Sequence, residues 1–229
     1  LKGNAYYSMG LARAMADRVT VDFIAFKKLY PEFLYSGGVS DRDPQFAVAE
    51  TDTLRIRKLI NYANPWSWVR SGFAVVARVV HLQWWSIPLA PIYLVMLIIF
   101  RFRKKKITFT VHNIIPHESS FLDFFLTKLV LFFGDTFIVH SKANRDSLIQ
   151  KYGLRRSVVH EIHMPIHDMY QGEEIKAELI RKEIGIPLGA MVILSFGNIR
   201  EYKGIDRLIA SLTSIFNYVP AAHLLIVGQ

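Results

Sequence analysis

The sequence predicts an α/β protein built from two doubly wound domains, the second of them truncated. Short apolar runs typical of buried strands alternate with stretches whose apolar residues recur at helical spacing, five times before about residue 165 and once more after it. Glycine and proline turns separate these segments. Of the 229 residues, 52% are hydrophobic and 21% are charged, so the chain can bury a core and a disordered protein is excluded.

The chain is strongly basic, with a formal net charge of +9 and an isoelectric point near 9.7. This balance favours an anionic partner: nucleic acid, a lipid surface or a phosphorylated ligand. The sequence contains no cysteine, which excludes disulfides and thiolate metal sites and fits a reducing compartment. We therefore predict a cytoplasmic location, with a peripheral place on the inner face of the membrane as an open alternative.

The first predicted elements are a helix that follows Gly3-Asn4 and runs through Asp17, and a strand over residues 19–26. Residues 27–64 are rich in breakers, and we expect loop there. Within them, Asp41-Arg42-Asp43 has an Asp-x-Asp pattern that binds metal in some transferases. No apolar strand leads into it, so we interpret it as a solvated turn. A helical stretch over residues 64–77 follows.

Residues 79–85 are expected to form a strand, and residues 87–100 an apolar helix opened by Pro88 and Pro91. This apolar run is shorter than the roughly 20 residues needed to cross a bilayer. Two interpretations remain: a core helix followed by solvated charges, or a helix with a basic end lying against an anionic membrane surface. The basic end consists of Arg101, Arg103, Lys104, Lys105 and Lys106.

The next strand, residues 107–111, delivers His112 and Asn113 to its carboxyl end, where open α/β sheets bind ligands. The helix over residues 121–133 is apolar nearly all round, so we expect it to be deeply buried or to meet another apolar surface. A strand at 136–140, a helix from Ser141 that ends before Gly153, and a strand at 158–162 complete this part. A strand-to-linker run cannot place His160, His163 and His167 on one face, so we predict no metal site there.

The last part contains a helix over residues 174–184, an apolar strand over residues 191–196 and a helix that begins at Gly204-Ile205. The turn between strand and helix starts at Gly197 and carries Arg200 and Lys203. Backbone N–H groups at such a helix start point at an anion, and two cations beside them suit a diphosphate. The alternative is an ordinary turn with two solvated charges.

Residues 196–209, Phe-Gly-Asn-Ile-Arg-Glu-Tyr-Lys-Gly-Ile-Asp-Arg-Leu-Ile, resemble the opening of the C-terminal domain in glycosyltransferase family 4. Residues 110–113 (Thr-Val-His-Asn), 116–118 (Pro-His-Glu) and 83–85 (Gln-Trp-Trp) resemble a branch of the same family. Its enzymes have the GT-B fold, in which two Rossmann-like domains face each other across a cleft. Many members have Arg directly after the first glycine of the loop, where this chain has Asn198.

The resemblance implies a role for each candidate residue. Arg200 and Lys203, with Gly197 and Gly204, would hold the donor diphosphate, and His112 would lie near the reacting sugar. Gly3 and Asn4 resemble the tail of a glycine-rich turn on the acceptor side, whose preceding strand is not in the sequence. The implied reaction is retaining transfer of a hexose or related sugar from a nucleotide-sugar, which is a substrate, to a glycan or lipid-linked acceptor, with no metal or other cofactor.

The expected organisation is an N-terminal acceptor-side domain over residues 1–165, a linker over 166–173 and the beginning of a nucleotide-sugar-binding domain over 174–229, so we expect a fragment. Two other classes stay open. One is a non-catalytic membrane-associated scaffold derived from a transferase. The other, a basic nucleic-acid-binding module, is disfavoured because the cations cluster in one patch and no reading motif is present, so nucleic acid is not a predicted partner.

Overall fold

The computed structural model describes residues 2–29, 50–112, 121–165, 176–197 and 199–228. The chain divides into two compact units, unit 1 over Leu1–Tyr170 and unit 2 over Gln171–Gln229, and each is described by itself. The predicted linker, residues 166–173, lies outside the described residues, as do Asp41-Arg42-Asp43, Asn113, residues 116–118, Ser120, His167 and Asn198.

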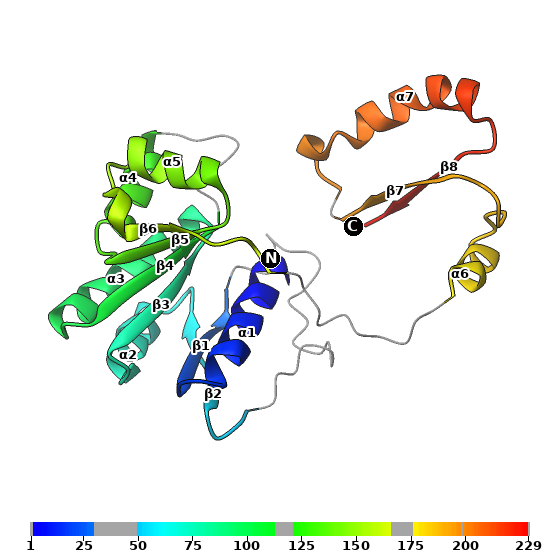
Figure 1. The fold of residues 1–229 in the computed structure, drawn as a ribbon. Coiled ribbons are helices and arrows are strands. Elements are labelled where there is room, and N and C mark those ends of the chain that lie inside the picture. Colours follow the sequence, from blue (N-terminus) through cyan, green and yellow to red (C-terminus); the bar gives the residue numbers. More distant parts are fainter. Residues whose placement is uncertain (1, 30–49, 113–120, 166–175, 198, 229) are drawn as a thin grey trace. The chain divides into compact units, whose positions relative to one another are not determined.

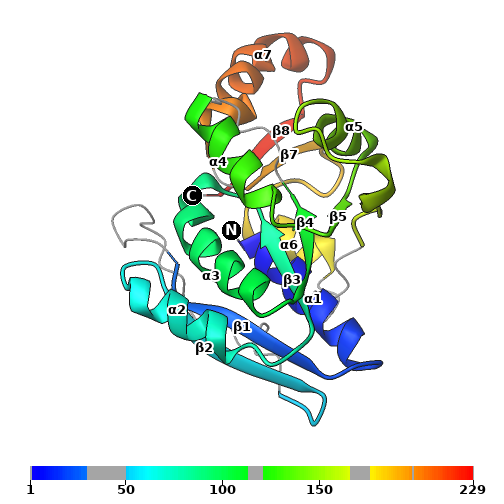
Figure 2. The same cartoon turned by 90° about the vertical axis from the view of Figure 1, so that its left-hand side faces the viewer.

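Unit 1 is organised around a four-stranded parallel sheet with the order β3-β4-β5-β6. Helices α3, α4 and α5 lie on one face of this sheet, and α2 lies beside α3 against β2 (Figures 1 and 2). The strands agree with the predicted ones within two residues at either end, and they are β3 Val79–Trp84, β4 Lys106–Val111, β5 Thr136–Val139 and β6 Val159–Glu161. The helices are α2 Pro65–Ala74, α3 Ala90–Phe102, α4 Phe121–Leu131 and α5 Lys142–Gln150, with short 3-10 turns at Ile87–Leu89 and Arg156–Val158.

The main core lies between this sheet and its helices. Its fully buried large side chains come from the strand faces and from the inner side of α3, which explains why both are continuous apolar runs in the sequence. Removal of this apolar surface from water stabilises unit 1, by about 1.5–3 kcal/mol for each large side chain. The largest of these side chains are Trp84, Phe100, Phe109, Phe137, Leu89, Leu97 and Ile107.

Helix α4 is only partly buried, so the expectation of deep burial is not met within unit 1. Thr127, Val130 and Leu131 face the core, whereas Phe121 and Phe125 are among several apolar side chains of α4 that are exposed. The helix is apolar all round, but in unit 1 only one side of it is covered.

A second pair of strands corrects the expectation of loop over residues 27–64. β2 Leu54–Asn61 pairs in parallel with β1 Val21–Lys28. Leu54 lies in a cluster with α1 and Ile60 lies in the main core, with an irregularity of register between them, and the three cations of the strand obscured its apolar residues in the sequence. Among the described residues these two strands form a sheet of their own, whose side chains Ile24, Phe26 and Ile60 join the main core.

Helix α1 Lys2–Ala16 packs on β1 and β2, on the opposite side from α2 (Figures 1 and 2). Ala12 and Ala16 contact Leu54 in a small separate cluster. Helices therefore lie on both sides of the strands, as the doubly wound prediction requires.

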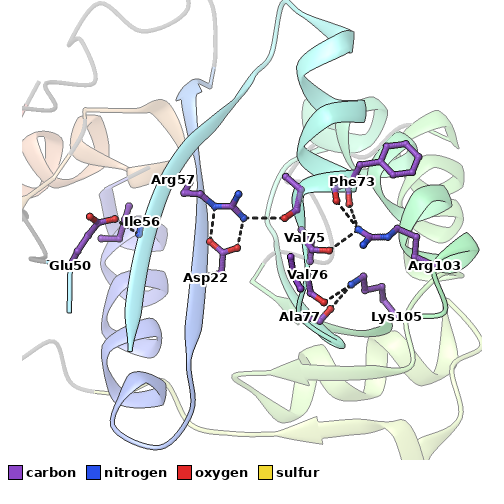
Figure 3. A network of polar contacts seen from close by, with 12 residues as sticks. Asp22, Glu50, Ile56, Arg57, Phe73, Val75, Val76, Ala77, Arg103 and Lys105 are labelled. Atoms are coloured by element: carbon purple, nitrogen blue, oxygen red, sulfur yellow. Dashed lines mark hydrogen bonds and ion pairs between the residues drawn. The ribbon is translucent and has the colours of Figure 1, made fainter. Parts of the chain in front are cut away.

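The basic run after α3 is not a solvated stretch of charge. Arg103 Nη1 donates to the carbonyls of Gly72, Phe73 and Val75 at 3.3, 2.8 and 2.6 Å, and Lys105 Nζ donates to those of Val76 and Ala77 at 2.9 and 2.6 Å (Figure 3). These bonds satisfy carbonyl groups at the end of α2. Arg101 forms an ion pair with Asp135 and also donates to the Phe133 carbonyl. Three of the five cations thus hold α2, α3 and the start of β5 together.

Unit 2 contains a two-stranded parallel sheet, β7 Val192–Phe196 and β8 His223–Val227, connected by helix α7 Ile205–Tyr218. Helix α6 Ala177–Glu183 precedes β7, and a 3-10 turn, Glu201–Lys203, precedes α7. Ala190 and Ala222 are the buried hydrophobic residues of this unit among those described.

Candidate functional site

The turn after β7 has the backbone that its two glycines permit. Gly197 has φ +123° and its amide donates to the Val227 carbonyl at 2.9 Å, so the strand ends in register with β8. Gly204 adopts the left-handed conformation, with φ 65° and ψ 30°, and serves as the N-cap of α7. A residue with a Cβ is strained in either conformation, which explains glycine at both positions.

The start of α7 is suited to bind an anion. Gly204 has no side chain to cap the helix, so the amides of residues 205–207 have no partner within the helix. Arg200 lies just before the 3-10 turn and Lys203 ends it, and both side chains are exposed. Within the described part of the chain their charged groups make no hydrogen bond or ion pair, although Lys203 Nζ lies 5.6 Å from the centre of the Tyr202 ring. Four predicted residues (Gly197, Arg200, Lys203 and Gly204) thus lie in one turn with free amides and free positive charge.

His112 follows β4 at the carboxyl edge of the main sheet. Its amide donates to the Trp84 carbonyl at 2.9 Å, and its Nε2 lies 2.8 Å from Gln83 Oε1. The Tyr93 hydroxyl donates to the backbone carbonyl of Gln83 at 2.8 Å, which fixes this strand end. With the amide oxygen of Gln83 facing the ring, Nε2 carries the proton and Nδ1 keeps its lone pair.

Burial above all, and then the neighbouring His140 and His81, lower the pKa of His112 to about 4. The imidazole is therefore neutral at physiological pH. Its Nδ1 is buried and makes no hydrogen bond among the described residues. A neutral ring with a free acceptor nitrogen can accept a hydrogen bond from a hydroxyl group.

His140 and Tyr7 complete a ring cluster around His112. Tyr7 of α1 meets both histidines edge-on, with ring centres 4.9 Å apart in each case, and the two imidazoles lie 5.3 Å apart. His140 Nδ1 lies 2.9 Å from the Ile162 carbonyl, so it is the donor, and Nε2 is left as a second buried acceptor that has no partner among the described residues.

Sequence reasoning did not propose Tyr7, Gln83 and His140 as site residues. A signal was present, because His112 and His140 each follow the last residue of a parallel strand, and adjacent parallel strands end at the same edge of a sheet. Gln83 pairs with Thr110 in the neighbouring strand, two residues before His112. The contact with Tyr7 depends on how α1 packs, which no local pattern indicates.

Gly3 and Asn4 lie inside the first turn of α1 rather than in a turn before it. The Asn4 carbonyl accepts a bond from the Ser8 hydroxyl at 2.7 Å. Their role on the acceptor side stays a prediction. In the described part of the chain, no group of three His, Asp or Glu residues could hold a metal ion. No described helix is long and apolar enough to span a membrane.

The arrangement of parallel strands and helices defines the class of protein. Crystal structures of Anabaena Alr3699/HepE resemble the chain in fold. The complex with UDP and glucose gives a TM-score of 0.67 at 15% identity, covering 99% of this chain and 57% of that one. The complex with UDP-glucose gives 0.65 at 16% identity and the same coverage, and the complex with UDP gives 0.57 at 14% identity, covering 77% and 48%. The fold is GT-B, and the chain spans about half the length of these structures.

The family follows from the sequence match. The sequence pattern of glycosyltransferase family 4 matches residues 2–168, which is most of the chain. The protein belongs to glycosyltransferase family 4. No curated protein matches it by sequence.

Proposed function

We propose that this chain is part of a retaining glycosyltransferase that moves a sugar from a nucleotide-diphosphate sugar to a hydroxyl acceptor. The observation that carries the proposal is the turn before α7, where the exposed Arg200 and Lys203 lie beside a helix start that has no side-chain cap. Family membership supplies the reaction class. UDP-glucose, present in one of the structures with the same fold, is the first donor to test.

The chemistry of bond cleavage explains why such a turn is useful. When the bond between sugar and diphosphate breaks, the leaving nucleoside diphosphate gains negative charge. Arg200 can bind two phosphate oxygens at once, Lys203 supplies a point charge, and the amides of residues 205–207 donate hydrogen bonds. Donors aimed at the charge that develops stabilise the transition state, and removing one typically lowers the rate 100- to 1,000-fold. No metal or other cofactor is needed in this scheme.

On the side of unit 1, His112 would orient the reacting sugar. Its free Nδ1 can accept a hydrogen bond from a sugar hydroxyl, and the low pKa keeps this nitrogen unprotonated. Gln83 is the positioning residue that selects the tautomer. The acceptor is a saccharide or a lipid-linked glycan, bound on the side of Gly3 and Asn4, and the protein works in the cytoplasm or at the inner face of the membrane.

The test is transfer of labelled sugar by the protein that carries this chain. The double variant Arg200→Ala, Lys203→Ala should lose at least 100-fold in kcat/KM. The matched control, Lys176→Ala with Lys182→Ala, removes two exposed cations at helix α6 and should transfer normally. A chelator should leave the wild-type rate unchanged. Transfer by the Arg200, Lys203 double variant at the wild-type rate would refute the assigned roles.

A further inference from the structure

The outer side of the helical layer in unit 1 is an apolar surface that none of the described residues of the unit covers. Helices α2, α3 and α4 lie side by side, α3 and α4 on one face of the main sheet and α2 against β2, with α3 packed against both neighbours (Figure 2). Each helix buries one side and leaves an apolar stripe outside. We call this surface the outer helical face, and it includes Phe73 on α2, Ile98 and Phe102 on α3, Phe121 and Phe125 on α4, and Phe132 directly after α4.

The exposure of these side chains is unusual for a free protein surface. Phe102, Phe121 and Phe132 are 82%, 85% and 78% exposed, and they lie on or directly after two adjacent helices. Single exposed apolar residues are normal, but contiguous patches on several elements mark an interaction site. The spacing of four residues from Ile98 to Phe102 and from Phe121 to Phe125 keeps each stripe on one side of its helix.

The charge of this region identifies the kind of partner. Residues 53–117, which include α2 and α3, contain ten Lys and Arg and no Asp or Glu, so this segment carries more than the chain's net charge of +9. Arg101, Arg103 and Lys105 are engaged within unit 1. The exposed cations are placed among the apolar groups: Arg70 lies one turn from Phe73 on α2, and Lys128 lies between Phe125 and Phe132 on α4.

The end of the face carries further positive charge. Lys104 and Lys106 follow Phe102 directly, and the Lys106 amide donates to the Arg78 carbonyl at 2.9 Å, which brings Arg78 to the same end. All three side chains are exposed. Aromatic side chains interspersed with cations are what an anionic bilayer surface attracts, since the rings enter the acyl boundary while the cations meet lipid phosphates.

We propose that the outer helical face of unit 1 docks on the surface of an anionic lipid bilayer. The protein then lies on the membrane through three short helices instead of crossing it. Helix α4 contacts the 3-10 turn Ile87–Leu89, which follows the carboxyl end of β3, so one end of the docked face adjoins the sheet edge that carries His112. If the proposed transferase function holds, this arrangement favours a lipid-linked acceptor; binding to the bilayer does not depend on it.

Vesicle co-sedimentation of the full chain, without any donor, tests the proposal. Wild type should bind vesicles of three parts phosphatidylcholine to one part phosphatidylglycerol more tightly than pure phosphatidylcholine, and salt should weaken that preference. The variant Phe102→Ser, Phe121→Ser should lose at least tenfold in partitioning to both. The variant Arg70→Glu, Lys106→Glu should lose at least about 25-fold on anionic vesicles only, since each cation near the surface contributes about fivefold, equivalent to about 1 kcal/mol.

Two matched controls separate this face from the rest of the chain. Arg13→Glu reverses an exposed cation on α1, and Tyr218→Ser removes an exposed aromatic residue from α7; both should bind like wild type. Far-ultraviolet circular dichroism checks that every variant is folded. The proposal is overturned if wild type does not bind anionic vesicles, or if the controls lose as much as the variants of the face. It is also overturned if the Phe102, Phe121 variant abolishes self-association of the chain while vesicle binding persists, because the face would then meet a second copy.

Discussion

The low pKa of His112 makes the stability of unit 1 depend on pH in a defined direction. Because the folded ring has a pKa of about 4 while an unfolded histidine has about 6.5, the unfolded chain binds a proton in this range that the folded chain does not. The free energy of unfolding therefore falls as the pH drops from 7 to 5. The full pKa difference would lower the free energy of unfolding by about 2 kcal/mol at pH 5. Because solvent has partial access to the ring, we expect a loss of about 1 kcal/mol.

Urea unfolding followed by tryptophan fluorescence measures this loss in unit 1, since Trp66, Trp68, Trp84 and Trp85 all belong to it. In His112→Asn the difference between pH 7 and pH 5 should shrink by about 1 kcal/mol. The exposed His160 gives the control, because His160→Asn should leave the difference unchanged.

The variant Gln83→Glu changes the partner of the His112 ring instead of the ring itself. Its carboxylate would stand where Gln83 Oε1 lies 2.8 Å from the ring, and it should raise the pKa of His112 towards the ordinary value. The loss of stability at pH 5 should then be smaller than in wild type. An equal loss in wild type, His112→Asn and Gln83→Glu would refute the reasoning.

Two further predictions concern stability, and the same unfolding assay at pH 7 measures both. Arg103→Ala removes the donor from three carbonyls around the end of α2 and should cost about 2 kcal/mol, whereas Arg70→Ala on the exposed side of α2 should stay within about 0.5 kcal/mol; equal effects would show that the carbonyls are satisfied by water. Gly134→Ala puts a Cβ 2.4 Å from Phe137 Cζ and 3.0 Å from Phe109 Cδ2, and since both rings are fully buried it should cost at least about 2 kcal/mol. Gly10→Ala, in α1 with open space around it, should be neutral or stabilising by up to about 1 kcal/mol, and a neutral Gly134→Ala would contradict the packing of the core.

Much of the fold could be predicted because the spacing of apolar residues and the capping residues at helix starts indicate the same elements. The core strands are continuous apolar runs, and helices α2 and α5 begin where Asn64 and Ser141 accept bonds from the first-turn amides. Strand β2 was missed because Arg55, Arg57 and Lys58 interrupt its apolar residues. Arg57 is held by an ion pair to Asp22 in β1 and a bond to the Ala74 carbonyl (Figure 3), and these are contacts between segments that no local pattern shows.

The candidate site also has one part that the sequence predicts and another that it does not. The turn at Gly197, Arg200, Lys203 and Gly204 could be located from sequence because its backbone requires glycine and its cations are adjacent in the chain. The surroundings of His112 could not, because Tyr7, Gln83 and His140 come from three separate elements. What the sequence could indicate was the sheet edge at which His112 lies.

The two candidate regions have in common polar groups that the protein itself leaves unsatisfied. Helices α2 and α5 carry side-chain caps, yet α7, which is longer than either, begins at a glycine without one. In unit 1, the buried Nδ1 of His112 and Nε2 of His140 lack partners among the described residues, although an unpaired buried polar atom costs about 1–3 kcal/mol. A stable fold requires neither feature. The amides of α7 can donate to an anion, and the imidazole nitrogens can accept hydrogen bonds from hydroxyl groups; these are the interactions that the proposed function assigns to each unit.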